Sequence, residues 1–145
     1  MSDLINFIHE SNVNVIASNH DFAKTPSKES MIQILCKMQD MKADILKLAV
    51  MPQNSDDVLR LMEATKEMVK HHAKQPVVTI SMSDLGRITR VSGEEFGSCM
   101  TFGAGRDASA PGQIEADLCV GNEGHGNEGV EGVVGVVGVS LWILP

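Results

Sequence analysis

Apolar residues in the N-terminal two thirds of the chain recur at two spacings, one typical of helices and one typical of strands. Ser2 or Asp3 can cap a first helix that carries Leu4, Ile5 and Ile8, and residues 14–19 predict a short strand that ends at His20. We expect the next helix to begin at Thr25 and Pro26, with the threonine as cap and the proline at the first helical position. Its buried face carries an i, i+3, i+4, i+7 stripe of Met31, Ile34, Leu35 and Met38.

The same alternation continues through the middle of the chain. Residues 45–50 form an apolar run closed by Met51-Pro52, which predicts a second strand, and Asn54-Ser55 is expected to cap the following helix. The buried stripe of that helix is Val58, Leu61, Met62, Thr65 and Val69. Residues 77–82 predict a third strand and residues 99–102 a fourth. The first three strands begin about thirty residues apart, the spacing of successive βα units in a parallel sheet.

This order of elements predicts an α/β fold with parallel strands. A complete (β/α)8 TIM barrel takes roughly 250 residues, so four strands with their helices in a chain of 145 residues make half of one, a partial barrel. An open flavodoxin-like sheet fits the same periodicity. Half a barrel exposes two strand edges, which favours a homodimer or another rearrangement that covers them.

The composition, with 43% hydrophobic and 21% charged residues, is that of a soluble globular protein. A net charge of −7 argues against nucleic acid as a partner, because phosphate binding needs a dense basic face. The weakly polar run at residues 132–144 is too short and too rich in glycine to span a membrane. Three cysteines without a CxxC pair, and an N-terminus without a targeting signal, indicate a cytoplasmic protein.

Lys47 is the most informative residue of the second strand. Side chains alternate along a strand, so Lys47 shares one face with the small Ala49, while the other face is bulky and apolar (Leu46, Leu48 and Val50). A lysine held away from water lowers its pKa, and the neutral amine attacks a ketone to form an imine. The alternative is an edge-strand lysine that reaches water.

His20 lies where the first strand meets its loop. Active sites of parallel α/β folds gather at the carboxyl ends of strands, and an imidazole suits proton transfer to and from carbon or a leaving hydroxyl. The alternative is a loop histidine bonded to nearby backbone. His71 and His72 are adjacent on a helix and do not face one another, so we expect no metal site there.

Two long loops follow the third and fourth predicted strands, at residues 86–98 and 103–113. Both are expected at the active-site end. Arginine grips a carboxylate through two parallel hydrogen bonds, while serine and glutamine bind hydroxyls.

Five segments in order resemble type I 3-dehydroquinate dehydratase, the shikimate-pathway enzyme of aromatic amino acid biosynthesis. They are Ser18-Asn-His-Asp-Phe22 with Thr25-Pro26, residues 43–52, Thr79-Ile-Ser-Met82, Arg90-x-x-Gly93-x-x-Phe96-Gly97-Ser98 and Ala108-Ser-Ala-Pro-Gly-Gln113. The resemblance covers residues 1–114, which we interpret as the C-terminal half of the barrel. Residues 115–145 form a divergent tail rich in glycine and valine.

The resemblance implies a lyase that dehydrates 3-dehydroquinate to 3-dehydroshikimate without metal or organic cofactor. Lys47 matches the lysine that forms the Schiff base, and His20 matches the histidine that donates and accepts the proton. Arg90 matches the residue that holds the substrate carboxylate, and Ser109 and Gln113 match further substrate-binding positions.

Two departures from the family pattern keep other interpretations open. The N-terminal half of the barrel is absent, so the chain is alternatively a catalytically inactive half-barrel fragment or an interaction remnant. Another imine-forming barrel enzyme, such as an aldolase, is a second alternative. Past about Glu115 the closing amphipathic helix of the family is missing, for which we suggest a shifted reading frame or a gene-model error, and we expect this tail to be poorly ordered or to pack irregularly.

Overall fold

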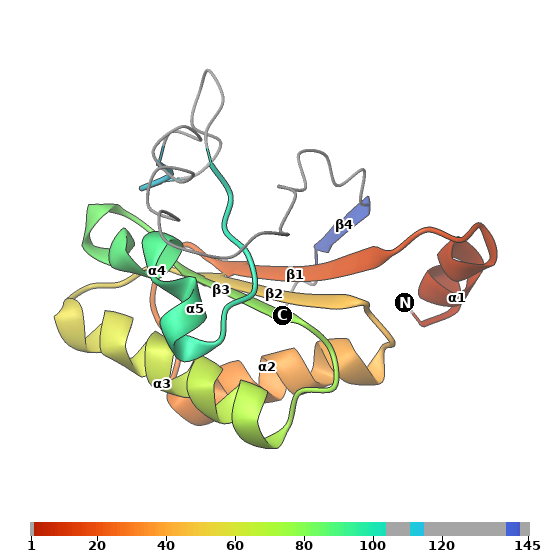
Figure 1. The fold of residues 1–145 in the computed structure, drawn as a ribbon, viewed down its shortest axis with the longest axis horizontal. Helices are drawn as coiled ribbons and strands as arrows, with labels where there is room; N and C mark the ends of the chain where they lie inside the picture. The colour runs from red at the N-terminus through yellow and green to blue at the C-terminus, as the bar shows by residue number, and fades with distance from the viewer. Residues whose placement is uncertain (1, 104–110, 115–138, 143–145) are drawn as a thin grey trace, which may run out of the picture.

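Alternating strands and helices occupy the first eighty residues, as the computed structural model shows (Figure 1); it describes residues 2–103, 111–114 and 139–142. In chain order the elements are α1 (Ser2–Glu10), β1 (Val15–Asp21), α2 (Lys28–Asp40), β2 (Ile45–Val50), α3 (Ser55–His71) and β3 (Val77–Ser81). A 3-10 turn η1 (Asp84–Gly86), two short helices α4 (Ile88–Val91) and α5 (Gly93–Phe96), and a distant strand β4 (Val139–Trp142) complete the described part.

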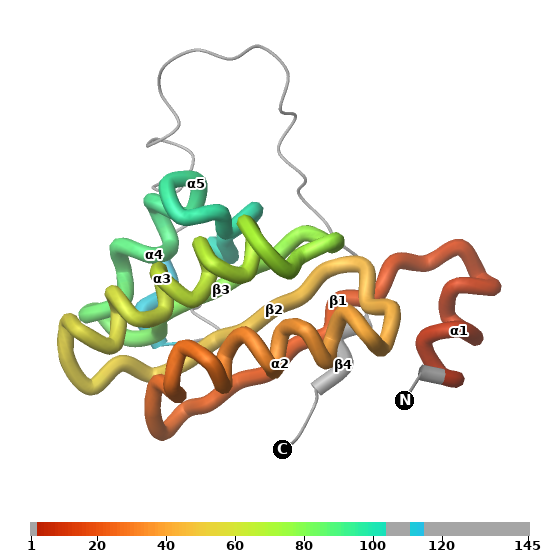
Figure 2. Tube along the Cα trace, turned by 90° about the horizontal axis from the view of Figure 1, so that it is seen from below, coloured from red at the N-terminus to blue at the C-terminus, as the bar shows by residue number. Residues whose placement is uncertain are grey.

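The strands form one sheet in the order β3-β2-β1-β4, and every neighbouring pair is parallel. Helices α2 and α3 lie side by side on the same face of this sheet (Figures 1 and 2). A doubly wound sheet has helices on both faces, whereas a barrel wall carries them on its outer face alone. The predicted α/β fold, a partial (β/α)8 barrel, is confirmed.

The main core fills the space between the sheet and these two helices. The bulky apolar face of β2 is fully buried there, against the stripes of α2 and α3. The core includes Leu46, Leu48, Val50, Met31, Leu35, Met38, Leu61 and Met68. One position of the α3 stripe was wrong: Val69 is 40% exposed and Met68 is buried in its place. Burial of each apolar side chain of this size contributes about 2 kcal/mol.

The start of α2 differs from the prediction. The helix begins at Lys28, and its N-cap is Ser27, whose side chain accepts a hydrogen bond from Ser30 N. Thr25 is buried, and its hydroxyl instead donates to Met51 O (3.0 Å). Because that hydroxyl serves the neighbouring strand end, it is not used as the cap. Of the predicted cap pair of α3, Asn54-Ser55, Asn54 is the N-cap, since it accepts from Asp57 N at 3.0 Å, and Ser55 is the first helical residue.

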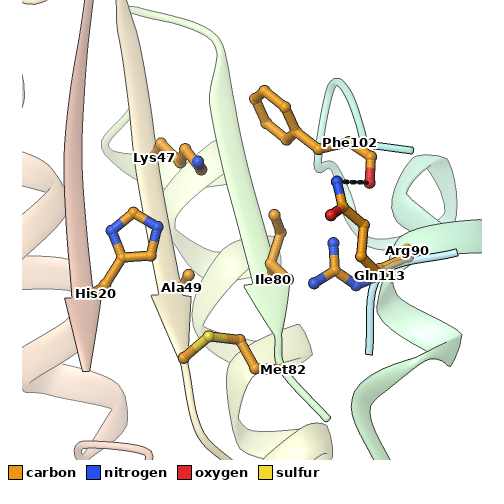
Figure 3. Close-up of a pocket in the computed structure, with 8 residues that line it drawn as sticks. All are labelled: His20, Lys47, Ala49, Ile80, Met82, Arg90, Phe102 and Gln113. Atoms are coloured by element: carbon orange, nitrogen blue, oxygen red, sulfur yellow. Dashed lines mark hydrogen bonds between the residues drawn. The ribbon is translucent and has the colours of Figure 1, made fainter. Parts of the chain in front are cut away.

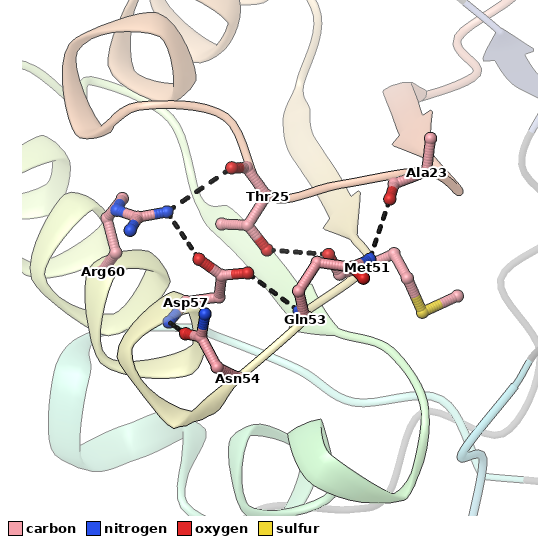
Figure 4. A network of polar contacts seen from close by, with 7 residues as sticks. All are labelled: Ala23, Thr25, Met51, Gln53, Asn54, Asp57 and Arg60. Atoms are coloured by element: carbon pink, nitrogen blue, oxygen red, sulfur yellow. Dashed lines mark hydrogen bonds and ion pairs between the residues drawn. The ribbon is translucent and has the colours of Figure 1, made fainter.

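A polar network ties the end of β2 to α3 (Figure 4). Asp57 is buried, accepting from Gln53 N (2.8 Å) and from Arg60 Nη1 (2.7 Å). The Gln53 side chain donates to Ala23 O at 2.9 Å, which joins the loop after β1 to the loop after β2. The network therefore fixes two adjacent loops at the carboxyl end of the sheet, where the site lies.

The predicted fourth strand at residues 99–102 is wrong. Cys99 N donates to Val77 O (2.9 Å), so the segment starts alongside β3, but no ladder follows in the described residues. A barrel strand is held between two neighbours, and this segment has a described neighbour on one side alone. The predicted loop at residues 86–98 is also wrong in part, because it folds into α4 and α5.

The fourth strand of the sheet comes instead from the tail. β4 pairs with β1 in parallel, from Val15 opposite Val139 to Ser18 opposite Trp142. The expectation of irregular packing is therefore wrong for residues 139–142, and residues 115–138 and 143–145 lie outside the described part. Among the described residues, no helix combines the length and apolar character needed to cross a membrane.

Candidate active site

Lys47 and His20 lie on the same face of neighbouring strands. In the parallel register Ser18 is opposite Lys47 and His20 is opposite Ala49. Because side chains two residues apart on a strand point to the same face, His20 shares the face of Ser18 and Lys47. This face is the one turned away from α2 and α3, the inner face of the barrel wall. Figure 3 shows both side chains on this face, above the sheet.

These two residues line a pocket at the carboxyl half of the sheet. Its walls are His20, Lys47, Ala49, Ile80, Met82, Arg90, Phe102 and Gln113. The Lys47 Nζ lies 4.3 Å from the centre of the Phe102 ring, a cation–π contact. Small Ala49 leaves the space between the amine and the end of the sheet open.

The surroundings of the amine and the imidazole lower the pKa of both groups. Burial, and to a smaller extent the positive charge of Lys47, lowers the pKa of His20 from 6.5 to about 4. Burial also lowers the pKa of Lys47, with a smaller effect from the nearby Arg90 guanidinium. His20 is consequently neutral at pH 7, and the cost of protonating Lys47 is increased.

Two further contacts orient the imidazole. The His20 ring stacks on Phe22, with centroids 5.7 Å apart and planes inclined by 10°. His20 Nδ1 lies 3.5 Å from Ser18 Oγ, at the edge of hydrogen-bond range. Stacking sets the plane of the ring, and the Ser18 hydroxyl lies beside its Nδ1.

Arg90 and Gln113 reach the same pocket from different segments. Arg90 lies on α4 and is only 4% exposed, and its Nη2 donates to Pro111 O at 3.2 Å. The Gln113 amide nitrogen donates to Phe102 O (3.2 Å) and to Gly103 O (3.0 Å), which ties the last loop to the segment after α5. Ser109, the other predicted substrate-binding residue, lies outside the described residues.

Three pocket residues were missed by the sequence analysis: Ile80, Met82 and Phe102. The alternation along β3 held the signal for two of them, because Ile80 is opposite Ala49 in the register and Met82 follows two residues later. Phe102 had no such signal. Its place above the Lys47 amine depends on how the chain returns to the sheet after α5.

The fold and the pocket define the class: a (β/α)-barrel wall that carries a desolvated lysine next to a neutral histidine on its inner face. The chain belongs to the type I 3-dehydroquinase family, whose sequence profile matches residues 1–119.

Individual relatives agree with this assignment. The 3-dehydroquinate dehydratase of Clostridioides difficile strain 630 is 55% identical over 114 residues, 79% of this chain and 45% of that protein. The 3-dehydroquinate dehydratase of Salmonella paratyphi B is 56% identical over 115 residues, 79% of this chain and 46% of that protein. The chain thus spans about half the length of the curated relatives that it matches.

Solved structures give the same result. The type I 3-dehydroquinate dehydratase of Clostridium difficile, determined with covalently modified comenic acid, superposes with a TM-score of 0.80 at 52% identity, covering 83% of this chain and 48% of that one. The 3-dehydroquinate dehydratase of Geobacillus kaustophilus HTA426 also superposes with a TM-score of 0.80, at 39% identity. The match covers 83% of this chain and 47% of that one.

Proposed function

We propose that this chain carries the Schiff-base centre of a 3-dehydroquinate dehydratase, with Lys47 as the imine-forming residue and His20 as the proton carrier. The observation that supports this most directly is the placement of a desolvated amine and a neutral imidazole on one face of adjacent strands. The family membership of residues 1–119 supports the substrate, 3-dehydroquinate.

In the proposed reaction the neutral Lys47 amine adds to the substrate ketone, and loss of water with uptake of one proton from solvent gives a protonated imine; the proton returns to solvent when the imine is hydrolysed. The imine accepts electrons, so His20 removes the proton from the adjacent carbon. The electron pair then expels the hydroxyl group one carbon further on. The imidazolium has a pKa of about 4, so it readily gives its proton to the departing hydroxyl, which leaves as water. Hydrolysis of the imine releases 3-dehydroshikimate with every carbon retained.

The other pocket residues are proposed to bind the substrate. Arg90 presents a guanidinium that fits the substrate carboxylate in a bidentate arrangement. Gln113 and Ser109 are proposed to bind its hydroxyl groups. No metal or organic cofactor takes part in this scheme, because the iminium itself supplies the electron sink.

The test is to incubate the complete chain with 3-dehydroquinate and borohydride and to weigh it by mass spectrometry. Borohydride reduces the imine to a stable amine, so we expect one adduct, located on Lys47 and lost in Lys47→Met. Lys42→Met, which alters an exposed lysine near β2, is the matched control and keeps the adduct. If the unmodified chain forms no adduct, the inactive half-barrel is the correct interpretation.

A catalysed reaction also has to be distinguished from mere imine formation. Formation of 3-dehydroshikimate is followed by chromatography of the products. A product that keeps all the carbons of the substrate supports dehydration, whereas cleavage of the carbon skeleton indicates the aldolase alternative.

We further propose that the chain forms a homodimer, works in the cytoplasm and divides into residues 1–114 and a tail at 115–145. Free Cys36 and Cys99 suit a reducing compartment. Sedimentation velocity of the chain at two concentrations tests the dimer, and a single monomer species at both excludes it.

A further inference from the structure

We propose that Gly112 is a positioning residue, which holds the Arg90 guanidinium in the pocket through the carbonyl group of Pro111. The inference rests on the proposed function, in which Arg90 binds the substrate carboxylate. It adds a reason why the last loop carries glycine at this position.

The Pro111 carbonyl joins two parts of the molecule. Its oxygen accepts from Arg90 Nη2 (3.2 Å) and from Ser83 N (3.2 Å). A carbonyl oxygen has two lone pairs, so both donors bind it at once. Since Arg90 is almost completely buried, bulk water cannot replace the bond if the carbonyl moves away.

Gly112 permits this arrangement because it has no side chain. Its φ is +73°, and an added Cβ would lie 2.2 Å from Ser83 O and 2.5 Å from Ser83 C. Both are backbone atoms, so no rotation of a side chain relieves the overlap. Ser83 itself has a positive φ of 60° and lies two residues after the end of β3. Any larger residue at position 112 therefore displaces the loop and the Pro111 carbonyl with it.

The first test is Gly112→Ala in the borohydride assay. We expect the concentration of 3-dehydroquinate for half-maximal adduct to rise about tenfold, as for a binding group displaced by a fraction of an ångström. The final yield of adduct should stay the same, because the Lys47 amine is untouched. An unchanged half-maximal concentration would overturn the proposal.

Gly97→Ala is the matched control. Gly97 also has a positive φ, +100°, but its added Cβ would meet the Val69 side chain at 3.1 Å. The substitution strains a left-handed glycine at the end of α5 without moving Pro111. We expect Gly97→Ala to change the half-maximal concentration less than twofold. A change as large as that of Gly112→Ala would mean that the Gly112→Ala effect is a general structural disturbance, and would overturn the proposal.

A double-mutant cycle links the effect to Arg90. In an Arg90→Met background the Pro111 carbonyl has no guanidinium to hold, so adding Gly112→Ala should cause no further weakening. If the fold-changes in half-maximal concentration of the two substitutions instead multiply, Gly112 acts through another group and the proposal fails.

A measurement without substrate separates this inference from the proposed function. In a chain labelled with 15N-arginine, the Arg90 guanidinium signals are those lost in Arg90→Met. Gly112→Ala should speed their hydrogen exchange about tenfold, whereas Gly97→Ala should not, because only the former breaks a bond of a buried donor. Faster exchange in a chain that forms no adduct supports the positioning role and refutes the function. Unchanged exchange refutes the positioning role, whatever the adduct result.

Discussion

Lowering the pH should destabilise the fold through His20, and His20→Asn should remove that part of the effect. The pKa of His20 falls from 6.5 in the unfolded chain to about 4 in the folded one, so the folded protein binds fewer protons between these values. Stability is consequently lost as the pH falls from 6.5 toward 4. At pH 5 the difference amounts to about 2 kcal/mol, and halving it because the side chain is partly exposed leaves about 1 kcal/mol.

Urea denaturation at pH 7, 6 and 5 measures this directly. Between pH 7 and pH 5, the free energy of unfolding of the unmodified chain should fall by about 1 kcal/mol more than that of His20→Asn. The comparison with the variant is needed because carboxylates and other histidines also titrate there. Parallel pH dependence of the two proteins would refute the reasoning.

The same argument predicts the effect of the neighbouring charge. Lys47→Met removes a positive charge that disfavours the imidazolium, so the pKa of His20 should rise part of the way toward its ordinary value. It should not rise fully, because burial is the larger cause. An NMR titration of the His20 ring decides the matter, and a pKa unaffected by the substitution would mean that the two groups are farther apart than the structure places them.

The remaining predictions concern the core and the loop network, with unfolding free energy as the measurement. Leu35→Ala should cost about 3 kcal/mol because Leu35 is fully buried, whereas Leu59→Ala, at a 56% exposed position of α3, should cost less than about 0.5 kcal/mol. Asp57→Ala should cost about 2 kcal/mol because two donors lose their buried acceptor, while the exposed neighbour Asp56→Ala should cost about 0.5 kcal/mol or less. Equal effects within either pair would contradict the burial and the contacts that the structure assigns.

Much of the barrel wall follows from local rules. The helical and strand periodicities predicted α2, α3 and the first three strands, because each element buries one face and the apolar positions mark that face. The alternation along the strand also predicted that Lys47 faces away from the packed core, and Lys47 does lie on the inner face of the sheet. These features depend on neighbours within one element, which the order of residues determines by itself.

Contacts between distant segments were decided by the tertiary structure. Thr25 is not a cap because its hydroxyl meets Met51, twenty-six residues away. The segment at 99–102 is not a strand, since a strand needs partners on the sheet, and the edge of β1 is instead covered by β4 from the tail. No local pattern encodes such choices.

The chemistry of the pocket divides in the same way. The order of residues along each strand sets which residue types face the inside: an imidazole on β1 and an amine on β2. Only the folded chain decided that Phe102 lies over the amine, that Arg90 is held by Pro111, and that the imidazole is neutral at pH 7. The physical reason is that desolvation and the charge of a neighbour act through space, so they exist only once segments far apart in the chain enclose the same small volume.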